Sequence, residues 1–302
     1  MRKLIILITA LLIPFSVFSV YTDVGSSAYT YLNIDASVKA GGMGGAFSSL
    51  MGNAEGLSYN LASVGNMEKS SISFTYMNWV LEGSSLNNLQ LALPLFGKFV
   101  LGFQWKVLNY PSIDKYDEYG FYLRQQFVPN DNMMTFSLST QLSDALYLGV
   151  GAGAVKENID SYAATAWFVN IGLIYKMDKL SAGIAANYLP VIEKEMVEEA
   201  MPLPMTFRIG VSYQAMDELL IAVDVEKPNY NSMMIHAGAE YKLMDIIAIR
   251  AGYKTGSVEG LTFGFGAEKE LLENFNVSVD YAFGLASYDF NALHRVGVTF
   301  TF

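Results

Sequence analysis

Side chains that could do covalent chemistry are few in this chain. It contains two histidines, His236 and His294, and no cysteine. Serine hydrolases usually carry their nucleophile on a Gly-x-Ser-x-Gly turn, and that spacing is absent from the sequence. Without cysteine the chain has no thiolate metal site, no disulfide and no residue for lipid attachment. The sequence therefore predicts a protein that is not an enzyme, with no catalytic residue, metal or cofactor.

A glycine-rich stretch, Gly41-Gly42-Met43-Gly44-Gly45, is a second candidate for chemistry. In phosphate-binding loops a Lys-Ser or Lys-Thr pair follows the glycines, and a parallel strand precedes them. The sequence has no such pair here and no pattern for a parallel sheet. We expect these glycines to let the backbone turn sharply instead.

Charged residues recur on one face of several alternating segments. They are Lys106, Lys176, Arg208, Asp224, Glu226, Glu240, Lys242, Arg250, Lys254, Asp280 and Arg295, with Arg124 added if its segment enters the interior. Both signs are present, and pairing lowers the cost of burying charge. If the alternating segments close into a barrel, as argued below, we favour a mutually neutralised network that fills its interior and holds an N-terminal plug, or hatch. A permeant-ion site is the alternative. The acidic stretch 193–199 is interpreted as a solvated turn rather than a divalent-cation site, because a flexible loop lacks fixed ligand geometry.

The amino end has the pattern of a secretory signal: Met1-Arg2-Lys3, an apolar run to Phe15, and small residues at Val17 and Ser19. We predict a signal peptide over residues 1–19, with a retained helical anchor as the alternative. The net charge of −10 disfavours nucleic-acid binding, which needs basic surface. Hydrophobic residues make up 52% of the chain, yet no later run is long enough for a spanning helix. Such a composition in alternating segments is typical of a transmembrane β-barrel.

From about Ser70 onward, segments of roughly ten residues place apolar side chains at every second position, the period of a strand with unlike faces. The alternation is clearest in 206–214, 219–226, 274–283 and 295–302. A soluble sandwich shows the same period, but so many one-sided segments without covering helices favour a barrel with apolar residues outward. Tyrosine and tryptophan near the segment ends are expected to form aromatic girdles.

Connection lengths give an independent indication of topology. Short turns are predicted at 95–98, 143–145, 177–179, 215–218, 243–245 and 269–273, and longer connections near 80–85, 157–164, 190–202, 228–231, 255–259 and 284–291. Outer-membrane barrels alternate short periplasmic turns with longer external loops. Treating 108–132 as one external excursion with its own hairpin gives fourteen antiparallel strands over 70–302, with both ends periplasmic.

Residues 20–69 precede these strands, and the part from Ala40 to Met67 lacks period two. We predict short helical turns broken by glycine, lying in the lumen as a plug or hatch. A periplasmic linker is the alternative.

Two motifs in this segment resemble a known family. Ala40-Gly41-Gly42-Met43-Gly44-Gly45-Ala46-Phe47 and Asn53-Ala54-Glu55-Gly56-Leu57-Ser58-Tyr59-Asn60 are similar to the N-terminal motifs of the PorV/PorQ group of FadL-like outer-membrane barrels, and Leu142 to Gly149 is similar to a later turn of that group. The chain departs from the group's tyrosine-asparagine-proline-alanine-glycine signature at Leu61 and Ser63. The resemblance implies a fourteen-stranded barrel with an N-terminal hatch that includes Gly41 to Gly45 and Asn60.

The sequence and the resemblance leave two functions open. The first expectation is a passive uptake channel for small hydrophobic molecules in the bacterial outer membrane. The alternative is a structural or secretion-accessory barrel that docks an envelope or secreted protein through its external loops. Further expected partners are outer-membrane lipid and the barrel-assembly machinery, which the resemblance implies reads the final strand with Phe300 and Phe302 as its signal.

Overall fold

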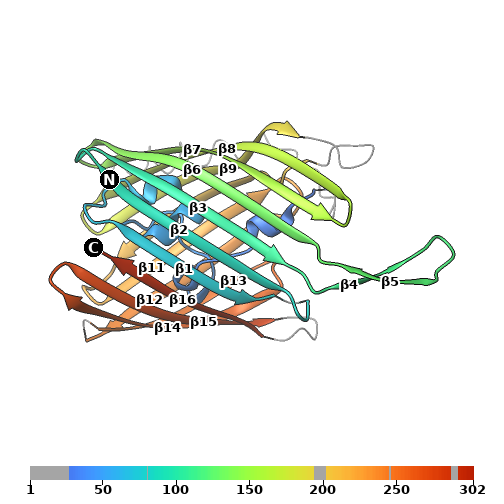
Figure 1. Cartoon of the computed structure of the whole chain (residues 1–302). Helices are drawn as coiled ribbons and strands as arrows, with labels where there is room; N and C mark the ends of the chain where they lie inside the picture. Colours follow the sequence, from blue (N-terminus) through green and yellow to red (C-terminus); the bar gives the residue numbers. More distant parts are fainter. Residues whose placement is uncertain (1–26, 80, 194–201, 245, 287–291) are drawn as a thin grey trace.

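The barrel is closed and antiparallel in the computed structural model (Figure 1), which describes residues 27–79, 81–193, 202–244, 246–286 and 292–302. Within these ranges fourteen strands form the barrel, which confirms the predicted fold class and strand count. The strands of the barrel are β1 (Ser71–Asn78), β2 (Ser85–Leu95), β3 (Phe99–Asn109), β6 (Asn130–Ser143), β7 (Leu146–Ile159), β8 (Tyr162–Met177), β9 (Leu180–Glu193), β10 (Thr206–Gln214), β11 (Leu219–Pro228), β12 (Met234–Leu243), β13 (Ile247–Lys254), β14 (Glu259–Leu272), β15 (Phe275–Ala286) and β16 (Leu293–Thr301). Each barrel strand pairs with its neighbour along the chain, and β1 closes the barrel against β16.

Alternation along the strands decides which side chains face inward. On β10, Arg208 and Ser212 are buried while Val211 and Tyr213 are exposed. On β16, Arg295 is fully buried and Val296 is half exposed. Large apolar side chains therefore cover the outside of the wall, and the charged side chains of these strands face the lumen, the reverse of a soluble sandwich.

Most short connections lie at one end of the barrel, which we call the turn end, and the longer ones lie at the other, the loop end, together with one tight turn. The turns predicted at 95–98, 143–145, 177–179 and 215–218 lie at the turn end, next to the carboxyl terminus. The turn expected at 269–273 is shorter and later, because β14 continues to Leu272 and β15 begins at Phe275. The long connection expected at 157–164 is wrong, because β7 and β8 continue to Ile159 and from Tyr162 with only two residues between them. Asp160 makes this tight turn with a φ of 54°.

Two further strands form a separate hairpin, the arm, between β3 and β6. They are β4 (Ile113–Tyr116) and β5 (Tyr122–Phe127), and they project from the loop end well beyond the wall (Figure 1). The predicted excursion with its own hairpin is therefore present. Arg124 lies on this arm and is exposed, so it does not enter the lumen.

Residues 27–69, which we call the inner segment, lie inside the barrel (Figure 1). They contain the short helices η2 (Thr30–Asn33), α2 (Val38–Gly42), η3 (Ala54–Ser58) and η4 (Leu61–Val64). None of the helices in the described ranges is long and apolar enough to cross a membrane. The α2 helix packs against β13 to β16, whereas η3 and η4 contact the opposite part of the wall.

Glycines on both sides allow the inner segment to approach the wall closely. Gly44 has a φ of +65°, and a Cβ placed on it would lie 2.7 Å from the backbone nitrogen of Tyr253. On the wall, a Cβ at Gly252 would collide with the backbone of Met43 and Gly44. A side chain at either glycine would therefore push the segment away from the strands.

Candidate functional site

The inner segment is held by polar groups of the wall that bond its backbone. Asp224 accepts hydrogen bonds from the N–H groups of Phe47, at 3.0 Å, and Ser48, at 2.8 Å. Lys106 donates from Nζ to the carbonyl oxygens of Leu32, at 2.7 Å, and Ile34, at 3.0 Å. Two wall residues of opposite charge thus satisfy four backbone groups of a segment that has no sheet partner.

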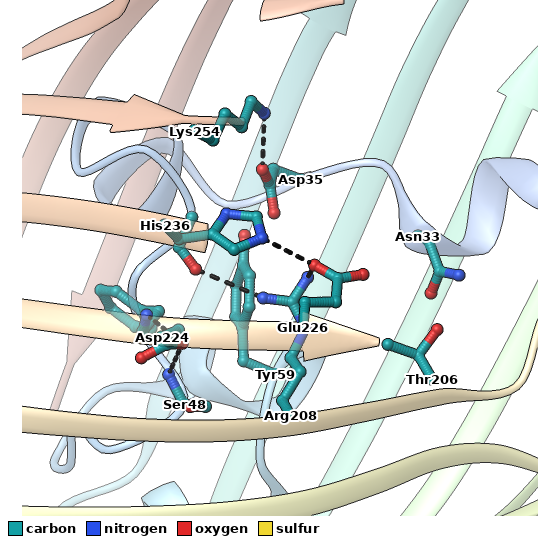
Figure 2. A network of polar contacts seen from close by, with 12 residues as sticks. Asn33, Asp35, Ser48, Tyr59, Thr206, Arg208, Asp224, Glu226, His236 and Lys254 are labelled. Atoms are coloured by element: carbon teal, nitrogen blue, oxygen red, sulfur yellow. Dashed lines mark hydrogen bonds and ion pairs between the residues drawn. The ribbon is translucent and has the colours of Figure 1, made fainter. Parts of the chain in front are cut away.

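A buried group of three side chains lies beside the glycine turn (Figure 2). Arg208 pairs with Glu226 at 2.5 Å, and His236 Nε2 lies 3.0 Å from the same carboxylate. His236 Nδ1 lies 2.7 Å from the carbonyl oxygen of Gly44. Arg208 also packs over the ring of Tyr59, with its guanidinium carbon 5.1 Å from the ring centroid. This group joins β10, β11 and β12 to the inner segment.

A second buried group contains a charged residue of the inner segment, Asp35. Lys254 donates to Asp35 at 2.8 Å and to Glu259 at 2.6 Å. Arg295 binds both oxygens of Glu259, at 2.6 and 2.7 Å, and donates from Nε to the carbonyl oxygen of Asp35. The bidentate geometry and the shared carboxylates compensate for the loss of water around four buried charges.

The third group lies nearer the turn end. Arg250 pairs with Glu240 at 2.6 Å and with Asp280 at 2.7 Å. Of the candidate lumen residues, the structure brings most into these pairs or onto the inner segment: Lys106, Arg208, Asp224, Glu226, Glu240, Arg250, Lys254, Asp280 and Arg295. Lys176 and Lys242 instead line a cavity at the turn end and belong to none of the ion pairs in the described ranges.

Three members of these groups are absent from the set of lumen residues expected from the sequence. Asp35 precedes the alternating segments, and Glu259 falls in the connection predicted at 255–259. His236 is a lone histidine on an alternating segment. The structure places Glu259 at the start of β14, facing inward and 3% exposed. The two-residue period of β12 carries the only sequence indication for His236, since Gly238 and Glu240 share its face.

The expected hatch residues lie together in the inner segment. Gly41 and Gly42 end α2, Met43 caps it, and Gly44 and Gly45 follow with positive φ. Asn60 caps η4 and donates from its side-chain amide to the carbonyl oxygen of Ser48 at 2.8 Å. The proposed assembly residues, Phe300 near the end of β16 and Phe302 just after it, lie on the outward face, where the ring of Phe275 packs near both of their rings.

The inner segment separates two cavities of the lumen. One, of about 570 Å³, opens at the turn end and is lined by polar residues that include Lys176, Asp178 and Lys242. The other, of about 480 Å³, lies at the loop end, and we call it the outer cavity. Its aromatic lining consists of Tyr29, Tyr31, Trp79, Tyr110 and Tyr230. The floor of the outer cavity is an apolar cluster that includes Leu32, Leu108 and Leu293.

Carboxylates lie among these rings. Tyr110 donates a hydrogen bond from its hydroxyl to Asp131 at 2.9 Å, and Glu157 lies directly opposite Asp131 on the neighbouring strand. Burial and the charges of Glu157 and Asp131 raise the pKa of Tyr29 to about 12. Burial and the Asp131 carboxylate also raise the pKa of Tyr31. The rings of Tyr29 and Tyr31 therefore stay neutral at ordinary pH, and they lie close to negative charge.

Comparisons with solved structures identify this architecture. TodX, the toluene transporter of Pseudomonas putida, is 13% identical and superposes with a TM-score of 0.62 over 87% of this chain and 97% of its own. A mutant of the TodX monoaromatic hydrocarbon channel gives a TM-score of 0.63 at 12% identity, over 89% of this chain and 99% of its own. A FadL homologue of Pseudomonas aeruginosa gives 0.57 at 12% identity, over 88% and 97%. The chain has the fold of these FadL-like barrels.

Sequence comparisons add nothing to this fold assignment: no protein-family model matches the chain, and no curated protein matches it. In the described ranges, no group of three or more histidine, aspartate or glutamate side chains is arranged to hold a metal ion. The arrangement of the site is instead that of a binding cavity above a pinned segment. Aromatic rings, an apolar floor and a few polar groups line this cavity, a combination typical of cavities that bind small molecules.

Proposed function

We propose that this chain is an outer-membrane barrel of a bacterial cell that takes up small hydrophobic molecules passively. In this proposal ligand enters the outer cavity from outside, and a movement of the inner segment, acting as a hatch, opens the way to the turn end, which faces the periplasm. The outward-facing apolar side chains suit a surrounding bilayer, and the predicted signal peptide at residues 1–19, which lies outside the described residues, suits export. The PorV/PorQ group is the proposed subgroup.

The outer cavity carries this proposal. It is closed below by the apolar cluster around Leu32 and Leu108, and its lining combines tyrosine and tryptophan rings with a few charged side chains. A pore for ions or sugars would need an open polar path past the inner segment, whereas here this segment is hydrogen-bonded to the wall through Asp224 and Lys106. An aromatic cavity above a plug that can move fits hydrophobic solutes better than ions or sugars. The solved barrels of this fold include a toluene transporter, which supports the same choice.

Uptake by whole cells tests the proposal. Cells with and without the gene are given labelled toluene and a labelled medium-chain fatty acid, and accumulation is followed over time. We expect faster uptake of at least one compound in cells that carry the gene. Equal uptake over the whole series would reject the channel function. A variant lacking residues 299–302 serves as a control for cells that make the chain without a closed barrel.

The arm favours a second candidate function, docking of an envelope or secreted protein. It exposes four large aromatic side chains beyond the wall, Tyr116, Tyr119, Phe121 and Tyr122. A two-stranded hairpin with two free edges and exposed rings is an unusual surface for a protein without a partner. The other expected docking loop, around 190–202, lies mostly outside the described residues, as does the acidic stretch after Glu193. Affinity capture from detergent extract with the full protein and with an arm deletion tests this function: an envelope protein lost only with the deletion would support docking, and identical captured proteins would reject it.

A further inference from the structure

Two acidic side chains face each other in the outer cavity without a basic partner among the described residues. Asp131 on β6 and Glu157 on β7 are directly paired positions, and both point into the lumen. Asp131 is only 4% exposed. Like charges directly opposite on neighbouring strands repel one another. Such a pair is relieved by a shared proton or by a cation that lies between the two carboxylates.

The other charges of the outer cavity are already matched. The lining contains four carboxylates, Asp35, Asp131, Glu157 and Glu259, and one amine, Lys254. Lys254 and Arg295 together satisfy Asp35 and Glu259. None of the ion pairs in the described ranges includes Asp131 or Glu157. Lys106, an inward cation on the adjacent strand β3, is committed to two carbonyl oxygens of the inner segment.

A third polar group of the cavity is a buried tyrosine hydroxyl. Tyr31 is 4% exposed and lines the outer cavity, and its hydroxyl oxygen is buried without a hydrogen-bond partner among the described residues. A buried hydroxyl left unpaired is destabilising, because it has lost its hydrogen bonds to water. Tyr31, Asp131 and Glu157 all line the outer cavity. The cavity therefore combines aromatic rings with two carboxylates and an unpaired hydroxyl group.

We propose that the outer cavity binds hydrophobic molecules that carry a protonated amine, with the ammonium group between Asp131, Glu157 and the Tyr31 hydroxyl. An ammonium group has three N–H donors, and these side chains offer three acceptors. The rings of Tyr29, Trp79 and Tyr110 receive the apolar body of the ligand and stabilise its positive charge. Carboxylate ligands such as fatty acids are disfavoured by the same two acidic side chains. This inference rests on the proposed uptake function and names its substrate class.

Three probes of similar shape separate the charge from the hydrophobic body: 2-phenylethylamine is a cation at pH 7, ethylbenzene is neutral, and 3-phenylpropionate is an anion. Binding to the purified full-length barrel in detergent is measured by isothermal titration at pH 7. We expect the dissociation constant of the amine to be at least about tenfold lower than that of ethylbenzene, with the anion binding most weakly. An amine that binds no more tightly than ethylbenzene would overturn the inference whatever the variants show.

Variants then test which side chains cause the tighter binding of the amine. Asp131→Asn with Glu157→Gln should remove the preference, so that the amine and ethylbenzene bind with similar dissociation constants, and Tyr31→Phe should weaken amine binding several-fold. Asp144→Asn is the matched control, because Asp144 is exposed in the turn at the opposite end of the same β6–β7 hairpin. Heat-modifiable gel migration reports whether each barrel is closed. If the double variant fails to close, Asp131→Asn and Glu157→Gln are tested singly. A preference that survives in closed variants would also overturn the inference.

The two proposals fail in different ways. Binding and uptake of ethylbenzene without any preference for the amine would reject the substrate class and leave the uptake function intact. Tight, variant-sensitive amine binding together with equal uptake of all three probes by cells with and without the gene would support the binding site and reject transport.

Discussion

Asp224 on β11 accepts a hydrogen bond at 2.8 Å from the backbone N–H of Ser48, a residue 176 positions earlier in the chain. The neighbouring N–H of Phe47 donates to the same oxygen. Gly210 on the adjacent strand leaves the space in which this carboxylate lies, since a Cβ there would collide with it. One wall side chain therefore fixes the backbone of the inner segment at the level of the glycine turn.

Replacing this anchor should loosen the hatch. Asp224→Ala leaves two buried N–H groups without an acceptor, and we expect the attachment of the inner segment to weaken by about 2 kcal/mol. Single-channel recordings in planar bilayers should show more frequent openings than the wild type, while heat-modifiable migration stays normal. Asp217→Ala is the control, because Asp217 is exposed in the turn that precedes β11. Identical recordings for the wild type and Asp224→Ala would contradict an anchoring role.

A side chain introduced at the glycine turn tests the movement of the inner segment by steric displacement from the wall. Gly44→Val combines a positive φ with a Cβ 2.7 Å from the backbone of Tyr253, so the segment must leave the wall. We expect a closed barrel with raised conductance. Gly52→Asn is the matched control: Gly52 also has a positive φ, but a Cβ at Gly52 would have nothing within 4 Å, and asparagine tolerates this conformation. Unchanged conductance in Gly44→Val would count against a luminal hatch.

The buried charges give a prediction for stability. Glu259→Gln removes the carboxylate that Lys254 and Arg295 share, and it leaves Arg295 without an ionic partner in a fully buried position. We expect the free energy of unfolding in urea, measured from lipid vesicles, to fall by about 3 kcal/mol. The control is Glu268→Gln on the same strand, where the side chain is exposed and a change within about 0.5 kcal/mol is expected. Equal effects of the two variants would show that the ion pairs contribute nothing to the fold.

The wall could be predicted from the sequence because its pattern is local. Alternation along 206–214 or 295–302 needs only neighbouring residues to indicate a strand with one apolar face. The tight turn at Asp160 was hidden because Asn158, Asp160 and Ser161 form a polar run that looks like a loop. Strand β7 continues through Asn158 to Ile159, and Asn158 donates a hydrogen bond to Asn130 across the outward face.

The interior could be predicted only in part. The pairing of Lys254 with Asp35 joins residues 219 positions apart and depends on how the closed strands are staggered, which no local pattern encodes. Inward charges on alternating strands were identifiable individually, but their partners were not. Asp35 belongs to the inner segment, where side chains follow no period, and only the folded position of that segment shows its role.

The last prediction concerns closure of the barrel, which depends on the pairing of its first and last strands. Ser71 and Ile72 on β1 pair with Thr301 and Phe300 on β16. Just beyond them, the backbone groups of Ser70 and Phe302 exchange two hydrogen bonds, of 2.7 and 2.9 Å. An unpaired strand edge inside a bilayer leaves backbone N–H and C=O groups without partners, each at a cost of several kcal/mol.

Deleting residues 299–302 removes this end of the seam together with the two phenylalanines on its outward face. We expect the truncated chain to remain in the periplasm, to be sensitive to protease, and to migrate at the same gel position whether boiled or unboiled. Phe300→Leu with Phe302→Leu is the matched control, since it keeps the backbone pairing and removes only the aromatic rings. A defect in this control as well would show that the rings are needed for assembly. Heat-modifiable migration of the truncated chain in the outer membrane would contradict the closing role of these residues.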